Sequence, residues 1–285
     1  MQRLGTRSAR LAVATGLGLV VAALVVGVSA VAQSSGPHPS APSRDLLPDL
    51  VQEAPSQLLI SVGSAHGHTT YSLGFSSAVR NIGAGPLLLS GSRPNAATLT
   101  MTVDQTIDRA GQAPLVAPIP GHMQYVVSPD HRHWHYLRFD RYMLRHAGSI
   151  TAVVADKKTG FCLGDDYKIS KPPAGSPPYS VFVGRCGLKQ PGLLHVSEGI
   201  SVGYGDSYSA FLEGQSLPLD GLANGRYVLV HEVNVDHSIK ERSYANDAAS
   251  ALLDIHWSGG RPHIHVLATC PDTDRCDLPG QTLSG

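Results

Sequence analysis

The chain has 285 residues, a length that suits one large domain or two modest ones. Lysine plus arginine balances aspartate plus glutamate at 22 each, so the composition gives no reason to expect a nucleic-acid partner or a strongly charged membrane surface. Thirty glycines and twenty prolines mark turns and break helices, which favours a turn-rich β protein over a helical one.

The N-terminus has the features of an export signal. Arg3, Arg7 and Arg10 precede an apolar run over residues 11–32, and Ala30 to Ala32 offers a small-residue cleavage site. We therefore predict a signal peptide over residues 1–32. The apolar run is also long enough to cross a bilayer, so an uncleaved membrane anchor over residues 11–32 is the alternative. Both interpretations place the rest of the chain outside the cytoplasm, secreted or anchored.

Composition also divides the rest of the chain. Residues 33–45 form a Pro/Ser-rich linker, residues 46–270 form the expected folded domain, and residues 271–285 form a C-terminal tail.

Four cysteines allow three disulfide connectivities. Export favours two disulfides over a thiolate metal site, because secreted proteins fold in an oxidising environment. The cysteines concerned are Cys162, Cys186, Cys270 and Cys276.

Short apolar or alternating segments, separated by turn signals, predict an all-β chain. Residues 98–103 alternate polar and apolar side chains, as a strand buried on one face does, and residues 169–179 must form a loop. The fold class that fits is an antiparallel β-sandwich with long decorated loops, preceded by the signal or anchor helix. The other expected strands cover residues 58–62, 71–79, 87–89, 124–127, 133–144, 150–155, 225–235 and 250–256.

The candidate site is a histidine triplet at strict alternation. On an extended strand, His131, His133 and His135 project to one face, while Trp134 and Tyr136 project to the other. Three neutral imidazoles on one face form a ligand set for copper or zinc, with a position left open for water, oxygen or substrate. The alternative is a histidine-rich exposed strand that binds nothing.

Other histidines carry weaker signals. His263 and His265 repeat the alternation on a late strand, but two members are more typical of a surface. Any of five further histidines could orient a metal ligand, although a solvated histidine is the more ordinary interpretation of each. They are His66, His68, His122, His195 and His231.

Three motifs in order resemble those of the lysyl oxidase family of copper-dependent amine oxidases. The first is the triplet at residues 131–135, followed by Phe139 and Tyr142 in an F-x-x-Y pattern. The second is K-x-x-F-C-L over residues 158–163, and the third is G-I-S with D-S-Y over residues 199–208. A segment at residues 244–247 is similar to a late family strand. The resemblance covers roughly residues 120–256.

The resemblance implies a cofactor and a reaction. Copper would be bound by the three histidines, and Lys158 and Tyr208 would cross-link to form lysine tyrosylquinone. A primary amine and molecular oxygen would be converted to an aldehyde, hydrogen peroxide and ammonia. A disulfide between Cys162 and Cys186 would hold the Lys158 loop. The substrate could be a protein lysine, a peptide or a small amine.

One departure leaves the proton-abstracting base unassigned. Arg141 stands where the family has a histidine before the tyrosine of F-x-H-Y, and Asp206 is a candidate because it lies near Tyr208 in sequence. The runner-up hypothesis is a non-catalytic extracytoplasmic β-sandwich module that binds copper or zinc. A zinc hydrolase is weaker, since the triplet motif contains no glutamate to act as base.

Overall fold

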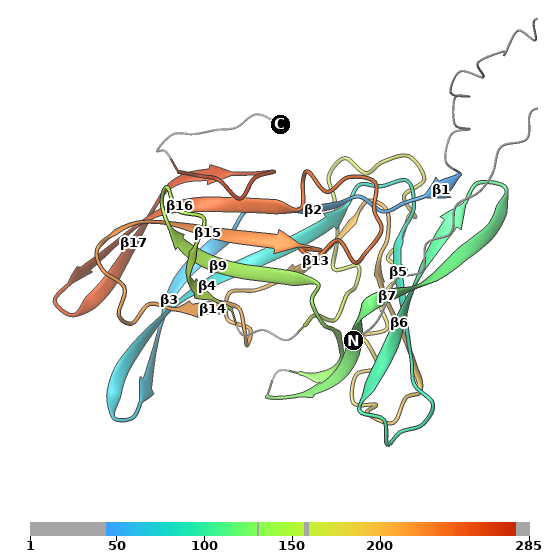
Figure 1. The fold of residues 1–285 in the computed structure, drawn as a ribbon, viewed down its shortest axis with the longest axis horizontal. Coiled ribbons are helices and arrows are strands. Elements are labelled where there is room, and N and C mark those ends of the chain that lie inside the picture. The colour runs from blue at the N-terminus through green and yellow to red at the C-terminus, as the bar shows by residue number, and fades with distance from the viewer. Residues whose placement is uncertain (1–43, 130, 157–159, 278–285) are drawn as a thin grey trace, which may run out of the picture. The chain divides into compact units, whose positions relative to one another are not determined.

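The structure is a computed structural model, and it describes residues 44–129, 131–156 and 160–277. The expected signal or anchor, most of the linker, Lys158 and residues 278–285 of the tail lie outside the described residues. Within these ranges every helix or strand is a strand, seventeen in all, and every strand pairing is antiparallel (Figure 1). The prediction of an all-β antiparallel chain is confirmed. Over the same ranges, we find no helix that could serve as a membrane span.

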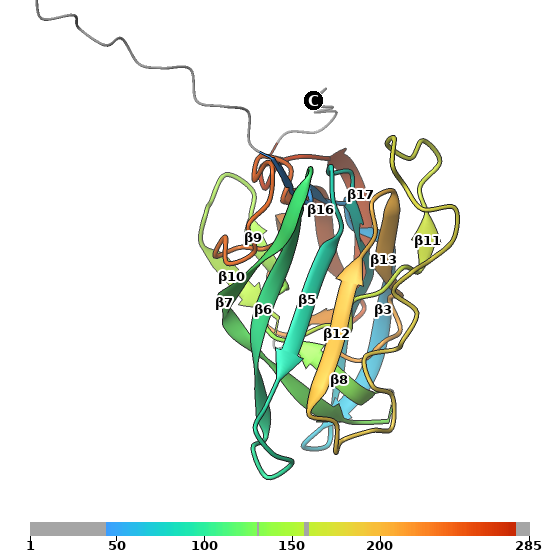
Figure 2. The ribbon, with the colours of Figure 1, turned by 90° about the vertical axis from the view of Figure 1, so that its right-hand side faces the viewer.

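The first sheet carries the histidine triplet at its edge. Its order is β12-β5-β6-β7-β8, with β1 also paired to β6, and Figure 2 shows β12, β5, β6 and β7 side by side. β8 is the last strand on this path, so one of its edges is open to groups from outside the sheet. The strands are β1 (Asp45–Leu46), β5 (Leu87–Ser92), β6 (Thr100–Arg109), β7 (Gln112–Val127), β8 (Arg132–Tyr136) and β12 (His195–Ile200).

The remaining strands form two further sheets. The second has the order β10-β9-β15-β16-β17, and the third has β11-β13-β4-β14 with β2 and β3 also on β4. The second sheet contains β9 (Asp140–His146), β10 (Ala152–Ala155), β15 (Gly225–Val233), β16 (Ala248–Ser258) and β17 (Arg261–Cys270). The third contains β2 (Leu50–Gln52), β3 (Ser56–Ala65), β4 (His68–Asn81), β11 (Tyr167–Lys168), β13 (Tyr204–Tyr208) and β14 (Ser216–Pro218).

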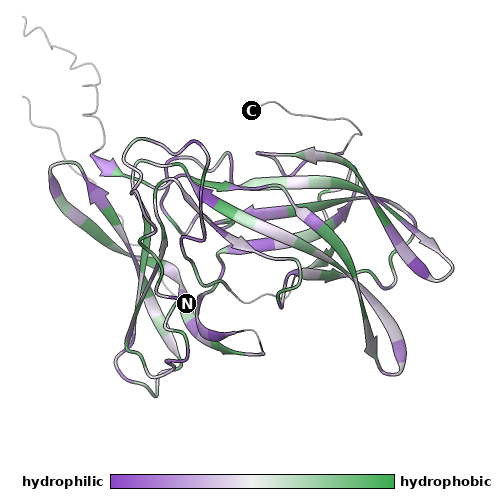
Figure 3. Ribbon diagram, turned by 180° about the vertical axis from the view of Figure 1, so that it is seen from behind, coloured by the Kyte–Doolittle hydropathy of each residue, from purple (hydrophilic) through white to green (hydrophobic). Residues whose placement is uncertain are grey.

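A single large core joins the three sheets. Leu89, Tyr142 and Phe75 come from the first, second and third sheets in turn, and all three are fully buried in the same cluster. Alternation supplies these side chains: Met101 and Val103 of β6 are buried while Thr102 between them is exposed, as the sequence predicts. Hydrophobic and hydrophilic bands accordingly alternate along the strands in Figure 3. Burial of this apolar surface is the main source of stability.

The predicted strand over residues 133–144 is wrong as a single element. β8 ends at Tyr136 and β9 begins at Asp140, because Arg138 adopts a left-handed backbone conformation with φ 73°. The Arg138 guanidinium pairs with Asp236 at 2.8 Å, and the carbonyl of Phe139 accepts a hydrogen bond from Asn234. The turn sends the chain from the first sheet to the second, so the triplet and Tyr142 lie in different sheets.

The remaining expected segments each overlap an observed strand, and residues 169–179 form a loop as predicted. The strands that contain the third family motif, β12 and β13, were not expected. Both contain small or polar residues, which gave a weak strand signal.

His231, one of the five histidines considered as able to orient a metal ligand, is buried in the core between two aromatic rings. The His231 ring lies between Phe75 and Tyr142, with ring centroids 4.7 and 4.5 Å away, and it is fully buried. Neither ring nitrogen has a hydrogen-bond partner among the described residues. Burial lowers the pKa of His231 to about 3, so the ring is neutral at physiological pH.

We expect His231→Met to stabilise the metal-free protein by about 1–3 kcal/mol at pH 7, because it removes unsatisfied buried polar atoms. The folded-state pKa of about 3 lies below the value of 6.5 for an unperturbed histidine. Wild-type stability should therefore fall as the pH drops below 6.5, by about 1.4 kcal/mol per pH unit. The variant lacks this loss. Urea unfolding at pH 7, 6, 5 and 4 should show that the difference in free energy of unfolding between variant and wild type grows as the pH falls. A difference that stays constant with pH would contradict the lowered pKa of His231.

Candidate functional site

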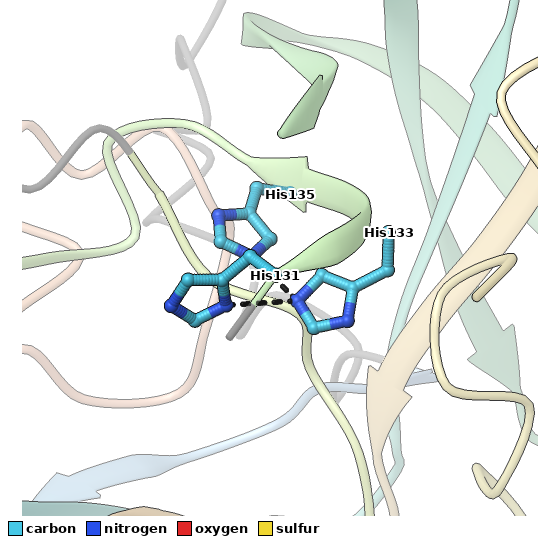
Figure 4. Close-up of side chains that lie close together, drawn as sticks. All are labelled: His131, His133 and His135. Atoms are coloured by element: carbon cyan, nitrogen blue, oxygen red, sulfur yellow. Dashed lines mark hydrogen bonds between the residues drawn. The ribbon is translucent and has the colours of Figure 1, made fainter. Parts of the chain in front are cut away.

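The three histidines of the triplet converge in space (Figure 4). His131 Nδ1 lies 3.2 Å from His133 Nε2, which lies 2.7 Å from His135 Nε2. The cluster is the only one among the described residues in which at least three potential ligand side chains gather, with ligand atoms within 4.8 Å of one another. His131 and His135 are buried, and His133 is half-buried.

The cluster fits a small metal ion. A metal–nitrogen bond of about 2.0 Å places neighbouring ligand nitrogens about 2.8–3.3 Å apart, close to the observed separations. Imidazole donors suit copper, zinc, iron or nickel, so the donor set selects a class of metal and not one element. His131 and His135 line a cavity of about 330 Å³, and His133 lines a second of about 500 Å³. Both cavities would let small molecules approach an ion held by the three histidines.

Strand β8 is held along both edges. On one side it pairs with β7, with Gln124 opposite His135. On the other, Trp134 donates its backbone N–H to the Cys186 carbonyl, and Tyr136 exchanges two backbone hydrogen bonds with Phe161. These backbone bonds fix which face of β8 carries the histidines.

The opposite face of β8 is packed into the core. Trp134 and Tyr136 are fully buried, as the alternation predicts. The guanidinium of Arg93 lies 4.6 Å from the Trp134 ring centroid and donates hydrogen bonds to four backbone carbonyls. Tyr136 donates its hydroxyl to the Pro120 carbonyl at 3.0 Å. A face anchored this firmly leaves the histidines little freedom to rotate away from one another.

A disulfide joins the two segments that border the open edge of β8. Cys162 and Cys186 are bonded, and the second disulfide links Cys270 to Cys276. Cys162 follows Phe161, so the bridge holds both backbone partners of β8 together. Gly160 is equally constrained: a Cβ there would lie 2.6 Å from the Tyr136 carbonyl oxygen, closer than real Cβ atoms approach.

Replacing both Cys162 and Cys186 by serine should destabilise the protein more than replacing the other pair. The bonds span 24 and 6 residues, and loop entropy predicts losses of about 3.5 and about 2.4 kcal/mol. Because the first pair also holds β8, its loss should weaken metal binding, whereas loss of the second should not. Urea unfolding and metal titration of both double variants check this, and equal metal affinity would contradict it.

Tyr208, the predicted quinone precursor, is buried at the end of β13. Its hydroxyl hydrogen-bonds to the Cys162 carbonyl at 2.9 Å and makes a very short hydrogen bond with Asp206 Oδ2. Its ring lies edge-on to Phe161 with centroids 4.7 Å apart. Burial and the neighbouring Asp206 raise the pKa of Tyr208 well above 10, so the phenol is neutral at physiological pH.

Asp206 is itself an unusual carboxyl group. It is 2% exposed, and burial, followed by the charge of Asp166, raises its pKa well above the ordinary value near 4. Asp166 is exposed and accepts hydrogen bonds from the backbone and side chain of Ser207. The carboxyl groups of Asp206 and Asp166 and the phenol of Tyr208 therefore lie close together around β13.

Tyr208 borders a different cavity from the histidines. That cavity, of about 250 Å³, is lined by Tyr208, Glu53 and Tyr167. Between Tyr208 and β8 lies the Phe161–Cys162 segment, which contacts both. Lys158 lies outside the described residues, but Gly160, two positions later, borders the cavity of His131 and His135.

Two polar residues that tie the motifs together were not predicted. Asp165 is buried and accepts four hydrogen bonds, from the backbone and hydroxyl of Ser201 and from the backbone of Val181 and Phe182. Glu198, 1% exposed, accepts one from the backbone of Leu163, and burial raises its pKa well above the usual value. An acidic side chain beside a family motif was the only signal in the sequence.

Other candidates lie away from the site. Arg141 pairs with Glu232 at the surface. His263 and His265 are exposed on β17. The exposed histidines that we considered as supporting donors are His66, His68, His122 and His195. In the segment similar to a family strand, the Asn246 side chain donates a hydrogen bond to Asp49 Oδ1 at 2.9 Å. Burial raises the pKa values of Asp247 in this segment and of the neighbouring Glu241.

Comparison with known families agrees with these motifs. A model described as lysyl oxidase matches residues 94–266, more than half of the chain, and this range contains the histidine cluster, Cys162, Asp165 and Tyr208. A search of curated proteins found no match. The chain belongs to the lysyl oxidase family.

Proposed function

We propose that this protein is an extracytoplasmic, copper-dependent amine oxidase. It would convert primary amines to aldehydes with release of hydrogen peroxide and ammonia. The observation that carries the proposal is the cluster of His131, His133 and His135 beside an open cavity, in a chain of the lysyl oxidase family. The substrates are a primary amine, such as a protein lysine, a peptide or a small amine, and molecular oxygen.

Each group has a defined role in this proposal. The three histidines bind copper, and Lys158 and Tyr208 supply the lysine tyrosylquinone. When present, copper and the quinone together supply amine oxidation and oxygen reduction, while the protein orients and encloses them. The Cys162–Cys186 disulfide keeps the segment after Lys158 against both β8 and Tyr208. The two cavities at the histidines admit oxygen and substrate.

The same proposal covers the organisation of the whole chain. A β-sandwich catalytic domain over residues 46–270 follows the signal or anchor at 1–32 and the linker at 33–45, and precedes the tail at 271–285. Two disulfides support a location outside the cytoplasm, because such bonds persist in oxidising compartments.

Amine-dependent peroxide release by copper-loaded protein tests the activity. Wild-type protein should produce peroxide with a primary amine, and Tyr208→Phe should produce none while retaining copper. The variant keeps the buried ring and its contact with Phe161, so it removes only the hydroxyl. No peroxide from the wild type, or equal peroxide from the variant, would contradict the proposal.

A non-catalytic copper- or zinc-binding module is the second candidate. It is favoured by the position of Tyr208, whose hydroxyl is engaged by Asp206 and Cys162 and which borders a different cavity from the histidines. The two functions differ in one product: a binding module loaded with copper would keep Tyr208 unmodified.

A further inference from the structure

We propose that Asp206 is the general base that removes the hydroxyl proton of Tyr208 when this tyrosine is oxidised to build the cofactor. The inference rests on the proposed function, because it concerns the formation of the quinone. It assigns a step in maturation and not the removal of the substrate proton, which is the role considered for Asp206 from the sequence.

Geometry selects Asp206 for this step. Asp206 and Tyr208 are two residues apart on β13, so both side chains point to the same face of the strand. The Tyr208 hydroxyl hydrogen-bonds to Asp206 Oδ2 and to the Cys162 carbonyl. A peptide carbonyl accepts a hydrogen bond but is too weak a base to take a phenol proton. The carboxylate can do both.

The surroundings of Asp206 suit a base. General bases work best when their pKa lies near the operating pH, which is above the ordinary range of a carboxyl group. Burial and the adjacent Asp166 carboxylate raise the pKa of Asp206, while the Gly164 N–H opposes this effect. The neighbouring Tyr142 and Glu198 also raise the pKa of Tyr208. Burial and these neighbouring groups all disfavour the phenolate form of Tyr208. Removal of its proton therefore needs a base in direct contact with the hydroxyl.

The step balances with molecular oxygen as the oxidant. One oxygen atom enters the Tyr208 ring to give an ortho-quinone, and the other leaves as water; its two hydrogens, taken from solvent, balance the ring hydrogen and the hydroxyl hydrogen that Tyr208 releases as protons. The hydroxyl proton passes first to Asp206 Oδ2. Asp206 then returns it to solvent through its contact with Asp166, which is exposed. Copper at the histidine cluster would activate the oxygen.

The rate at which metal-free protein matures after addition of Cu(II) in air tests the inference. Peptide mass spectrometry measures modification of Tyr208 with time. We expect Asp206→Asn to bind copper with wild-type stoichiometry but to mature at least about 100-fold more slowly, a typical effect of losing a general base. Formate should partly restore the rate of Asp206→Ala. The matched control is Glu53→Gln, the same type of change at a carboxyl that lines the Tyr208 cavity, and it should mature normally.

The outcomes separate the two proposals. If wild-type protein never modifies Tyr208, both fall. If wild type matures and Asp206→Asn matures equally fast, only the role of Asp206 is overturned. If the variants fail to fold, the wild-type protein still tests the inference. Its maturation rate should rise with pH and fall in deuterated solvent, because a base must remove the hydroxyl proton. A rate insensitive to both pH and deuterium would overturn the inference.

Discussion

His133→Ala is expected to lower copper affinity by at least about 100-fold, because even changes to groups that merely orient ligands cost about 10–100-fold. His133 occupies the middle of the cluster, since its Nε2 is the atom that approaches both neighbouring imidazoles, at 3.2 and 2.7 Å. Removing it leaves two nitrogens on a strand whose backbone cannot shift to compensate. Without copper, no quinone should form.

Metal content after dialysis and a competition titration measure this effect. The matched control is His263→Ala, which removes an exposed histidine from the other alternating pair, on β17. It should leave copper binding unchanged. Retention of copper and normal quinone formation by His133→Ala would show that the cluster is not the copper site.

Asp165→Ala is expected to lower the free energy of unfolding by about 3–5 kcal/mol, because each buried donor left without its acceptor costs about 1–3 kcal/mol. Three of the four hydrogen bonds to its carboxylate measure 2.7 Å. The alanine would leave four buried or partly buried donors without an acceptor. The affected segments are the loop around Val181 and the third family motif at Ser201.

Urea unfolding of metal-free protein measures the loss, with Asp166→Ala as the control. Asp166 is the next residue but is exposed, so its replacement should change stability by less than about 1 kcal/mol. Equal losses from the two variants would contradict the assignment of Asp165 as the buried connection. Asp165 also lines the cavity that His133 borders, so its replacement should make that part of the cavity lining less rigid.

Local patterns in the sequence predicted that the three histidines lie together on one face of a strand. Alternation alone places His131, His133 and His135 on one face and Trp134 on the other, because side chains of a strand alternate strictly. The antiparallel class follows from the frequent turn signals between short alternating segments. Each of these features depends on residues close together in the chain.

The features that were not predicted depend on distant residues. The turn at Arg138 carries no glycine or proline, and its ion pair with Asp236 forms across 98 positions of the chain. Asp165 acquires its role only when Ser201 is brought beside it. Arg93 lies against Trp134 and donates to carbonyls 98 and 100 residues away in the chain. No local pattern marks these contacts, because tertiary packing creates them.

The relation between Tyr208 and the metal cluster was also beyond sequence analysis. Motif order suggests one shared site, whereas Tyr208 and the histidines line separate cavities with Phe161 and Cys162 between them. The motifs therefore name the residues that enter the proposed chemistry. How the described members of this set are arranged is shown only by the fold.

Peptide mass spectrometry of protein expressed with and without copper tests the central claim most directly. If this chain builds its cofactor, copper-loaded protein will yield a single cross-linked peptide that contains both Lys158 and Tyr208 and reacts with phenylhydrazine. Copper-free protein will yield two separate peptides. Two separate, unmodified peptides from fully copper-loaded protein would contradict the oxidase account and leave a metal-binding module.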